Sequence, residues 1–560
     1  MTTCISSTRA PRLVLRLLLR LLRLPVPLRS ALLLAPVMAL LVPALVPAGG
    51  GGPVAAGAVA AGRGTVVRTD GGLVRGTAAA DGYRSFQGIP YAAPPVGPLR
   101  WRPPLPARPW HGTRDATRPG DRCAQNADPL TGTARSTSED CLYLNVAVPP
   151  RRPGERLPVL VWIHGGGLSS GAGSDQDPRR LAADGHVIVV TVNYRLGVFG
   201  FFGHSGLPGS GDFGIMDQRA ALAWVGRNAA RFGGDGHEVT VFGESGGGDS
   251  VCAQLASPAA RGLFARAAIQ SGTCTDTNAV DDLYPGAGAA TATWKPLDAV
   301  RSAGAGVAER LGCKERALPC LRAMSAEQLL SAPAVAAVYW SPAYGTPTLP
   351  RSPGRAIAAG DFAHVPVLEG TTRDEATLLV AAALGQIGTG TLHDLLDRAL
   401  GPRAGEVAAA YPASRYGSPS LRWAAIVTDR AYACPNQRTE AVLASQVPTH
   451  AYEFADTHAP STFDMEPPFP LGAYHGSDLP YVWDVPGRTA LLSPAQRRLS
   501  GQMIRYLARF AATGDPNRPG LPHWPAVRGP APVLQRLAPP SDGGVHPATT
   551  AALHHCDLWD

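Results

Sequence analysis

Short apolar runs recur along the chain from about residue 65, and longer stretches with helical spacing lie between them. The apolar runs span residues 157–163, 187–192, 239–242, 267–270, 365–368 and 451–454. Residues 215–232 and 495–512 have the spacing of amphipathic helices. Strands that alternate with helices predict a mostly parallel sheet with helices on both faces. The runs at 159–163 and 187–192 are almost wholly apolar, as in central buried strands.

Two long tracts separate the later apolar runs. They cover residues 284–339 and 385–430 and are mainly helical in pattern. We expect them to fold over one end of the sheet as a cap rather than as independent domains. The pattern therefore predicts one α/β domain over residues 65–545.

The first sixty residues differ from the rest of the chain. They contain six arginines within the first 30 positions, an apolar run at 31–46, and small residues around Ala58-Val59-Ala60. This order is typical of a secretory signal peptide followed by a flexible leader. The alternative is a membrane anchor, but the apolar run is only about 16–18 residues long and contains Pro36 and Pro43. We expect cleavage within residues 1–60, secretion, and no stable membrane association afterwards.

The positive charge of the chain gives little support to a nucleic-acid partner. The net charge is +8, and the leader supplies six of those charges, so the remainder carries about +2. Nine cysteines are present, of which Cys4 lies in the leader. The other eight form no Cys-x-x-Cys pair and no zinc-like cluster, so disulfides are expected in an exported protein. No cofactor and no metal are implied.

A Gly-x-Ser-x-Gly pentapeptide, residues 243–247, directly follows the apolar run 239–242. A strand, a sharp turn and a helix in this order lift a serine hydroxyl clear of the sheet, where a histidine can reach it. Ser245 is therefore the candidate nucleophile, although a plain turn that contains a serine is the alternative.

Two further segments supply the other groups that ester hydrolysis needs. His164-Gly165-Gly166-Gly167 follows the apolar run that ends at Ile163, and its backbone N–H groups could bind an oxyanion together with that of Gly246. His475 lies in a glycine-flanked loop downstream and is a candidate base. Asp374 and Glu375 both follow the run at 365–368, and spacing alone does not choose the acid between them.

Many motifs resemble the type-B carboxylesterases, the carboxylesterase/lipase/cholinesterase group, and they occur in the order found in that family. The matching segments are residues 86–101, 138–146, 193–197, 217–218, 228–235, 243–247, 270–272, 475–483 and 513–517. The resemblance extends from about residue 65 to about residue 540.

The resemblance implies an α/β-hydrolase fold, a central mostly parallel twisted sheet flanked by helices with helical cap insertions. It also implies a triad of Ser245, Glu375 and His475, and an oxyanion hole formed by Gly166, Gly167 and Gly246. Gly246 departs from the alanine usual at that position, but its N–H donor is kept. Glu244 is expected to be a buried carboxylate that supports the triad or forms structural hydrogen bonds.

The same resemblance implies two disulfides, Cys123–Cys141 and Cys313–Cys320. Two more pairs, Cys252–Cys274 and Cys434–Cys556, are possible. The loop at 124–140 contains no aromatic residue, whereas cholinesterases place a choline-binding tryptophan there. A cholinesterase is therefore disfavoured.

Together these features predict a secreted serine esterase that cleaves small-molecule carboxylic esters through an acyl-enzyme. A lipase that acts on longer acyl chains is one alternative. A binding protein that has lost catalysis is another, and the presence of Ser245, Glu375 and His475 argues against it.

Overall fold

The computed structural model describes residues 65–276, 278–461, 463, 466–484, 491–529 and 532–559. The predicted signal peptide and its cleavage site lie outside these residues. Among the described residues, no helix has the length and apolarity needed to cross a membrane.

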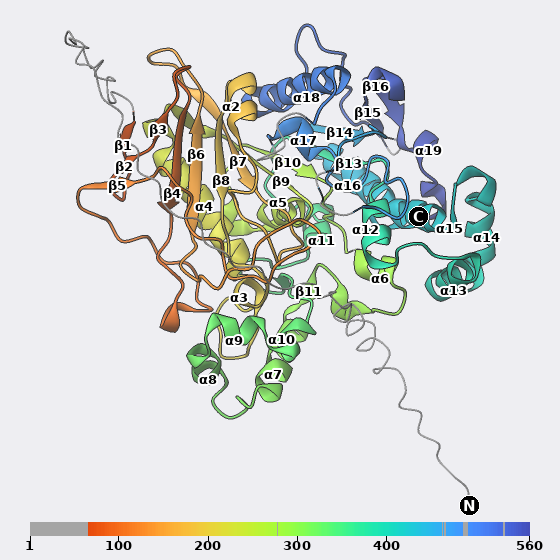
Figure 1. Ribbon diagram of the computed structural model, residues 1–560, viewed down its shortest axis with the longest axis horizontal. Coiled ribbons are helices and arrows are strands. Elements are labelled where there is room, and N and C mark those ends of the chain that lie inside the picture. The colour runs from red at the N-terminus through yellow and green to blue at the C-terminus, as the bar shows by residue number, and fades with distance from the viewer. Residues whose placement is uncertain are drawn as a thin grey trace, which may run out of the picture. The chain divides into compact units, whose positions relative to one another are not determined.

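A large twisted sheet organises the described chain (Figure 1). Its strand order is β16-β15-β14-β13-β10-β9-β7-β8-β6-β4-β3. Neighbouring strands from β8 to β15 run parallel, and antiparallel pairs close both edges. The strands are β3 (Thr77–Ala78), β4 (Arg84–Pro90), β6 (Tyr143–Val148), β7 (Leu157–Ile163), β8 (Ile188–Val192), β9 (Gly234–Glu244), β10 (Arg266–Gln270), β13 (Val367–Thr372), β14 (Thr449–Phe454), β15 (Val533–Leu537) and β16 (His546–Thr549). Two small sheets accompany it. One contains β1 (Val66–Arg68), β2 (Leu73–Arg75) and β5 (Thr113–Asp115), and the other contains β11 (Lys295–Pro296) and β12 (Ala343–Tyr344).

Both faces of the central strands are buried. In β7, Val159 and Val161 belong to one hydrophobic core, and Leu160 and Trp162 belong to the core on the opposite face. Because successive side chains of a strand point to opposite faces, a strand that is covered on both sides is apolar along most of its length. This explains the unbroken apolar run seen in the sequence.

Helices form the two outer layers and the insertions. α2 and α18 lie side by side against one face, at the top of Figure 1, while α4 and α5 pack against β9 and β10. The α-helices are α2 (Arg179–Gly185), α3 (Gly197–Phe201), α4 (Phe213–Phe232), α5 (Gly246–Ala256), α6 (Ala279–Leu283), α7 (Leu297–Arg310), α8 (Ala317–Ala323), α9 (Ala326–Leu330), α10 (Pro333–Ala336), α11 (Pro353–Ala358), α12 (Ala376–Ala383), α13 (Thr389–Leu400), α14 (Ala404–Ala410), α15 (Pro419–Thr428), α16 (Cys434–Ala444), α17 (Leu479–Val482), α18 (Pro494–Thr513) and α19 (Thr550–Leu553).

The two helical tracts predicted from the sequence become separate groups of helices. The first forms α7–α10, which gather at the bottom of Figure 1. The second forms α13–α15, which pack around a third hydrophobic core together with α12. A π-helical turn, η6 (Asp429–Ala433), joins α15 to α16.

Four disulfides join cysteines of the described chain. They are Cys123–Cys141, Cys252–Cys274, Cys313–Cys320 and Cys434–Cys556, so the two pairs that the sequence left open are also formed.

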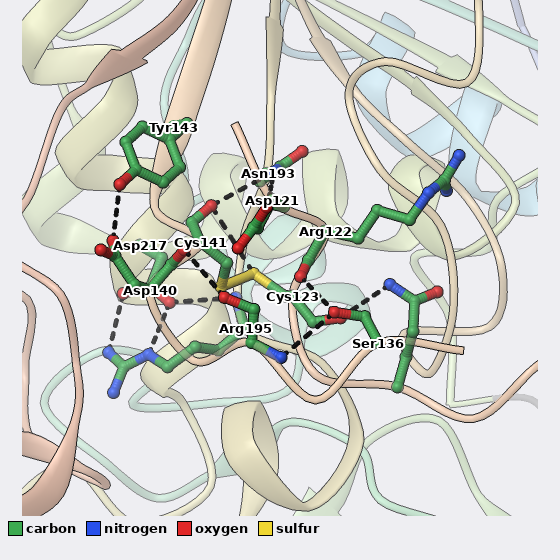
Figure 2. Close-up of a disulfide and its surroundings, with 12 residues drawn as sticks. Asp121, Arg122, Cys123, Ser136, Asp140, Cys141, Tyr143, Asn193, Arg195 and Asp217 are labelled. Carbon is green, nitrogen blue, oxygen red and sulfur yellow. Dashed lines mark hydrogen bonds and ion pairs between the residues drawn. A yellow bond between two sulfur atoms is a disulfide. The ribbon is translucent and has the colours of Figure 1, made fainter. Parts of the chain in front are cut away.

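Figure 2 shows the surroundings of the Cys123–Cys141 bridge. The Asn193 side chain donates hydrogen bonds to the carbonyls of Asp121 and Cys141, and so holds both ends of the loop to the chain after β8. Arg195 forms a buried ion pair with Asp217 on α4 close by.

Candidate active site

Ser245 lies in a strained turn between β9 and α5. Its backbone angles are φ 57° and ψ −126°, outside the favoured regions for a residue with a side chain. The turn is possible because its flanking positions are glycines. A Cβ added at Gly247 would lie 2.1 Å from the Ile163 carbonyl oxygen, and one at Gly243 would lie 2.5 Å from the Gly247 carbonyl carbon. The helix can therefore approach the sheet closely only without side chains at these positions.

The loop after β7 lies directly against this turn. A Cβ on Gly165 would be 3.2 Å from the Ser245 Cβ, and one on Gly246 would be 3.2 Å from the Gly167 nitrogen. Gly166 and Gly167 have positive φ values of 96° and 58°. Both keep part of their surface open to solvent. The structure thus brings the three proposed N–H donors and the serine into one small region.

The imidazole of His475 is held by the carboxylate of Glu375. Its Nδ1 lies 2.5 Å from Glu375 Oε2, and Glu375 is fully buried between β13 and α12. The other oxygen of Glu375 accepts a hydrogen bond from the Thr372 N–H at 2.8 Å. The neighbouring Asp374 instead accepts hydrogen bonds from Arg373 and from the Ala473 N–H. Geometry therefore selects Glu375 over Asp374 as the partner of the imidazole.

Glu244 connects the imidazole with the nucleophile turn. Its Oε1 lies 3.4 Å from His475 Nε2, and its backbone directly precedes Ser245. Glu244 is nearly fully buried, and this oxygen has no hydrogen-bond partner among the described residues. Burial, strengthened by the nearby charges of Asp478 and Glu375, raises the pKa of Glu244 to about 8 despite the opposing influence of His475.

The charges around His475 decide its protonation. Burial by itself lowers the pKa of the imidazole, but the charges of Glu375, Glu244 and Asp478 and the hydrogen bond to Glu375 raise it to about 9. An imidazole held by a carboxylate on one nitrogen can take a proton at the other, which is what a general base requires.

Three residues near the imidazole were missed by sequence reasoning. Asp249 lies one helical turn beyond Ser245, and its pKa is raised by burial to about 7. Asp478 accepts hydrogen bonds from Gln270 and Tyr452, and the Tyr432 ring lies 5.6 Å from the His475 ring. The four-residue spacing from Ser245 was a signal for Asp249, whereas Asp478 and Tyr432 depend on how distant segments pack.

One group of possible metal ligands occurs among the described residues, namely Asp456, His458 and Asp542. Asp456 is fully buried and already accepts hydrogen bonds from Tyr481 and Gln496. These two hydrogen bonds satisfy the buried carboxylate of Asp456, so its burial does not require a metal ion.

Comparisons with known proteins identify the family to which the chain belongs. The model of the carboxylesterase family matches residues 63–542. The chain is 37% identical over 483 residues to the para-nitrobenzyl esterase of Bacillus subtilis (strain 168), covering 82% of this chain and 92% of the relative. It is 34% identical over 520 residues to the cocaine esterase of Homo sapiens, covering 87% of this chain and 89% of that relative. It is also 35% identical over 480 residues to the pyrethroid hydrolase Ces2e of Rattus norvegicus, covering 80% of each.

Two solved structures show the same architecture. A thermophilic PNB esterase superposes with a TM-score of 0.72 and 33% identity, covering 89% of this chain and 99% of that one. A second PNB esterase gives a TM-score of 0.70 and 34% identity, covering 87% of this chain and 97% of that one. From its sequence, its sheet and the relatives it matches, the chain belongs to the carboxylesterase family, and it is a carboxylic-ester hydrolase with the α/β-hydrolase fold.

Proposed function

We propose that the protein hydrolyses small carboxylic esters in two steps through an acyl-enzyme on Ser245. His475 removes the proton of the serine hydroxyl as the oxygen attacks the ester carbonyl, and later donates it to the leaving alcohol. Glu375 orients the imidazole and stabilises its charged form. A water molecule then cleaves the acyl-enzyme with the same base.

The N–H groups of Gly166, Gly167 and Gly246 bind the negative charge that develops on the carbonyl oxygen. Each such donor is worth roughly 3 kcal/mol of transition-state stabilisation in other serine hydrolases. The observation that carries the proposal is the strained Ser245 turn packed against the glycine loop, with the His475–Glu375 pair beside Glu244, the residue that precedes Ser245.

The covalent step of this mechanism depends on the hydroxyl of Ser245. Ser245→Ala should lower kcat for p-nitrophenyl butyrate by at least about a thousandfold, because the covalent step is lost. A fluorophosphonate probe should label the wild type and not the variant. Wild-type turnover by folded Ser245→Ala would refute the mechanism.

Longer-chain acylglycerols are the second candidate substrate class. Helices α12–α15 carry apolar side chains of the kind that would bind an acyl chain, although packing in the third hydrophobic core explains the same side chains equally well. Activity on a triolein emulsion, compared with a graded series of soluble p-nitrophenyl esters, separates the two classes. The relatives' names point to para-nitrobenzyl, pyrethroid and cocaine esters as further test substrates.

We also propose that the protein is exported after removal of its N-terminal leader. Four disulfides among the described residues support this, because such bonds persist in oxidising compartments. N-terminal sequencing of protein from the culture medium should give a start near residue 60. Retention of the whole leader in the mature protein would contradict it.

A further inference from the structure

The N–H of Gly166, a proposed oxyanion donor, is oriented through the carbonyl of its own peptide group. That carbonyl belongs to Gly165, and its oxygen lies 2.9 Å from Nδ1 of the buried His164 ring. Only a protonated nitrogen is attracted to a carbonyl oxygen, so His164 carries its proton on Nδ1. Because a trans peptide is planar, with its C=O and N–H pointing in opposite directions, the imidazole sets the direction of the Gly166 N–H.

The next peptide group is held in the same way. The Gly166 carbonyl accepts hydrogen bonds from the N–H groups of Ser169 and Ser170, at 3.0 Å each, and these bonds set the direction of the Gly167 N–H. Among the described residues, neither the Gly166 N–H nor the Gly167 N–H has an acceptor. Both donors are therefore oriented by the protein while their hydrogens remain available to an oxyanion.

The groups that hold these carbonyls are supported in turn by residues 123–141, the disulfide loop, which the bridge in Figure 2 closes. Gln125 of this loop is fully buried and exchanges two hydrogen bonds with Gly171. Its Oε1 accepts from the Gly171 N–H at 2.8 Å, and its Nε2 donates to the Gly171 carbonyl at 2.9 Å. A Cβ on Gly171 would lie 2.5 Å from His164 Nδ1, so the backbone that Gln125 holds packs directly against the imidazole.

A second side chain joins the disulfide loop to the other donor. The Ser170 hydroxyl donates to Asp128 Oδ2 at 3.1 Å, and the N–H of the same serine holds the carbonyl of the second oxyanion peptide. Two antiparallel bridges across the disulfide loop, Gln125 with Ser136 and Asp128 with Thr133, fix the positions of both side chains. The disulfide loop thus reaches both oxyanion peptides by separate routes.

We propose that Gln125 is a positioning residue for the oxyanion hole, and that the disulfide loop supports catalysis through it and through the Asp128–Ser170 contact. Gln125 acts through Gly171 and the His164 ring, and not on the substrate. This inference rests on the proposed function, since it concerns the same oxyanion donors. The negative oxygen exists only in the transition state, so loss of this support should slow the reaction without weakening substrate binding.

Gln125→Met keeps the length of the side chain and removes both hydrogen bonds to Gly171. We expect kcat for p-nitrophenyl butyrate to fall about tenfold or more, which is part of the roughly hundredfold to thousandfold loss that follows removal of one donor. KM should stay within about threefold of the wild-type value, because the ground state carries no oxyanion. Ser170→Ala breaks only the contact with Asp128 and should give a smaller loss of the same kind.

A transition-state analogue separates the orientation of the donors from a general loosening of the fold. The ketone 1,1,1-trifluoropentan-2-one adds to a catalytic serine as a hemiketal and so places a negative oxygen in the oxyanion hole. Its Ki should rise in Gln125→Met and in Ser170→Ala by the factor by which kcat/KM falls in each variant.

The disulfide loop can also be opened at its base. Cys123→Ser combined with Cys141→Ser should lower kcat by about tenfold, because the loop no longer holds Gln125 in place. The matched control is Cys313→Ser combined with Cys320→Ser, which opens the bridge between the end of α7 and α8. Both variants should melt at lower temperature than the wild type, but only the first should lose kcat at a temperature where both are folded.

The outcomes separate this inference from the proposed function. Unchanged kcat and unchanged ketone Ki in folded Gln125→Met would overturn the positioning role alone, as would a raised KM at constant kcat or equal kcat losses in the two disulfide variants. If Gln125→Met does not fold, Ser170→Ala decides the question by the same measurements. A wild type that does not hydrolyse the ester through Ser245 would instead overturn the proposed function.

Discussion

The imidazole of His475 is surrounded by more negative than positive groups. Glu375 holds one of its nitrogens, Glu244 approaches the other, and Asp478 adds a third carboxylate whose charge acts on the ring. A general base must be neutral to accept the serine proton. Since the pKa of His475 is raised to about 9, kcat/KM should increase with pH and level off only above that value.

Glu244→Gln tests this electrostatic account. The change removes a negative charge beside His475 Nε2 and keeps the side-chain shape, so the pKa of His475 should fall. The ascending limb of the pH profile of kcat/KM for p-nitrophenyl butyrate should therefore move to lower pH, by about one unit or less. A limb that stays in place or moves to higher pH would show that Glu244 does not act through its charge.

At the residue level, the sequence located the sharp turn at Ser245 between a strand and a helix, because a local motif specifies that geometry. The turn at Ser245 and the glycines after β7 carry their own signal, because the backbone geometry requires glycine there. Asp374 and Glu375 could not be separated by spacing alone, since both follow the same strand. Their roles differ because the Ala473 N–H engages one of them, and that loop arrives from a distant part of the chain.

At the scale of elements, the nucleophile turn depends on close packing between α5 and β7. The Ile163 carbonyl occupies the space that a side chain on Gly247 would need. The close backbone contact between Gly247 and Ile163 thus fixes the start of α5 against the end of β7, and with it the strained turn at Ser245.

Gly247→Ala should therefore lower the free energy of unfolding by about 3 kcal/mol or more, because the methyl group overlaps a backbone atom. Gly226→Ala is a matched control at an exposed position of α4, where a Cβ meets nothing within 4 Å. That variant should gain about 0.5–1 kcal/mol from lower chain entropy. Urea unfolding of both variants gives the comparison, and equal stabilities would contradict the packing argument.

The apolar pattern located the central strands well but not their ends. β7 has the predicted bounds, whereas the strand that begins with the apolar run at 365–368 was expected to end at Gly370, and β13 covers Val367–Thr372. The additional residues are Thr371 and Thr372, which are buried and polar. Hydrogen bonds to β10 and β14 extend the strand there, and a pattern of apolar residues cannot reveal them.

At the scale of the whole molecule, the C-terminal segment is attached through a buried charge cluster. His554 Nδ1 lies 2.6 Å from Asp429 in η6, and its Nε2 lies 2.7 Å from Glu453 in β14. Both ring nitrogens face acceptors, so the imidazole must carry two protons. Although burial lowers its pKa, the hydrogen bonds to Asp429 and Glu453 raise the pKa of His554 to about 10.

This cluster makes stability depend on pH in a definite direction. The folded pKa of His554 is raised above its unfolded value of about 6.5, so its contribution is complete below that pH and is lost as the pH rises through about 10. The melting temperature of the wild type should fall between pH 7 and 10.5 more steeply than that of His554→Asn. Parallel curves for the two proteins would show that His554 is not charged in the folded state.

The Cys434–Cys556 bridge spans 122 positions and encloses the loop that carries His475. A protease that cuts once inside this span separates no fragment, since the bridge still connects both sides of the cut. Nicked enzyme should therefore migrate as the uncut polypeptide on a denaturing gel and split into two bands only after a reductant is added. Limited digestion followed only on non-reducing gels would miss the damage.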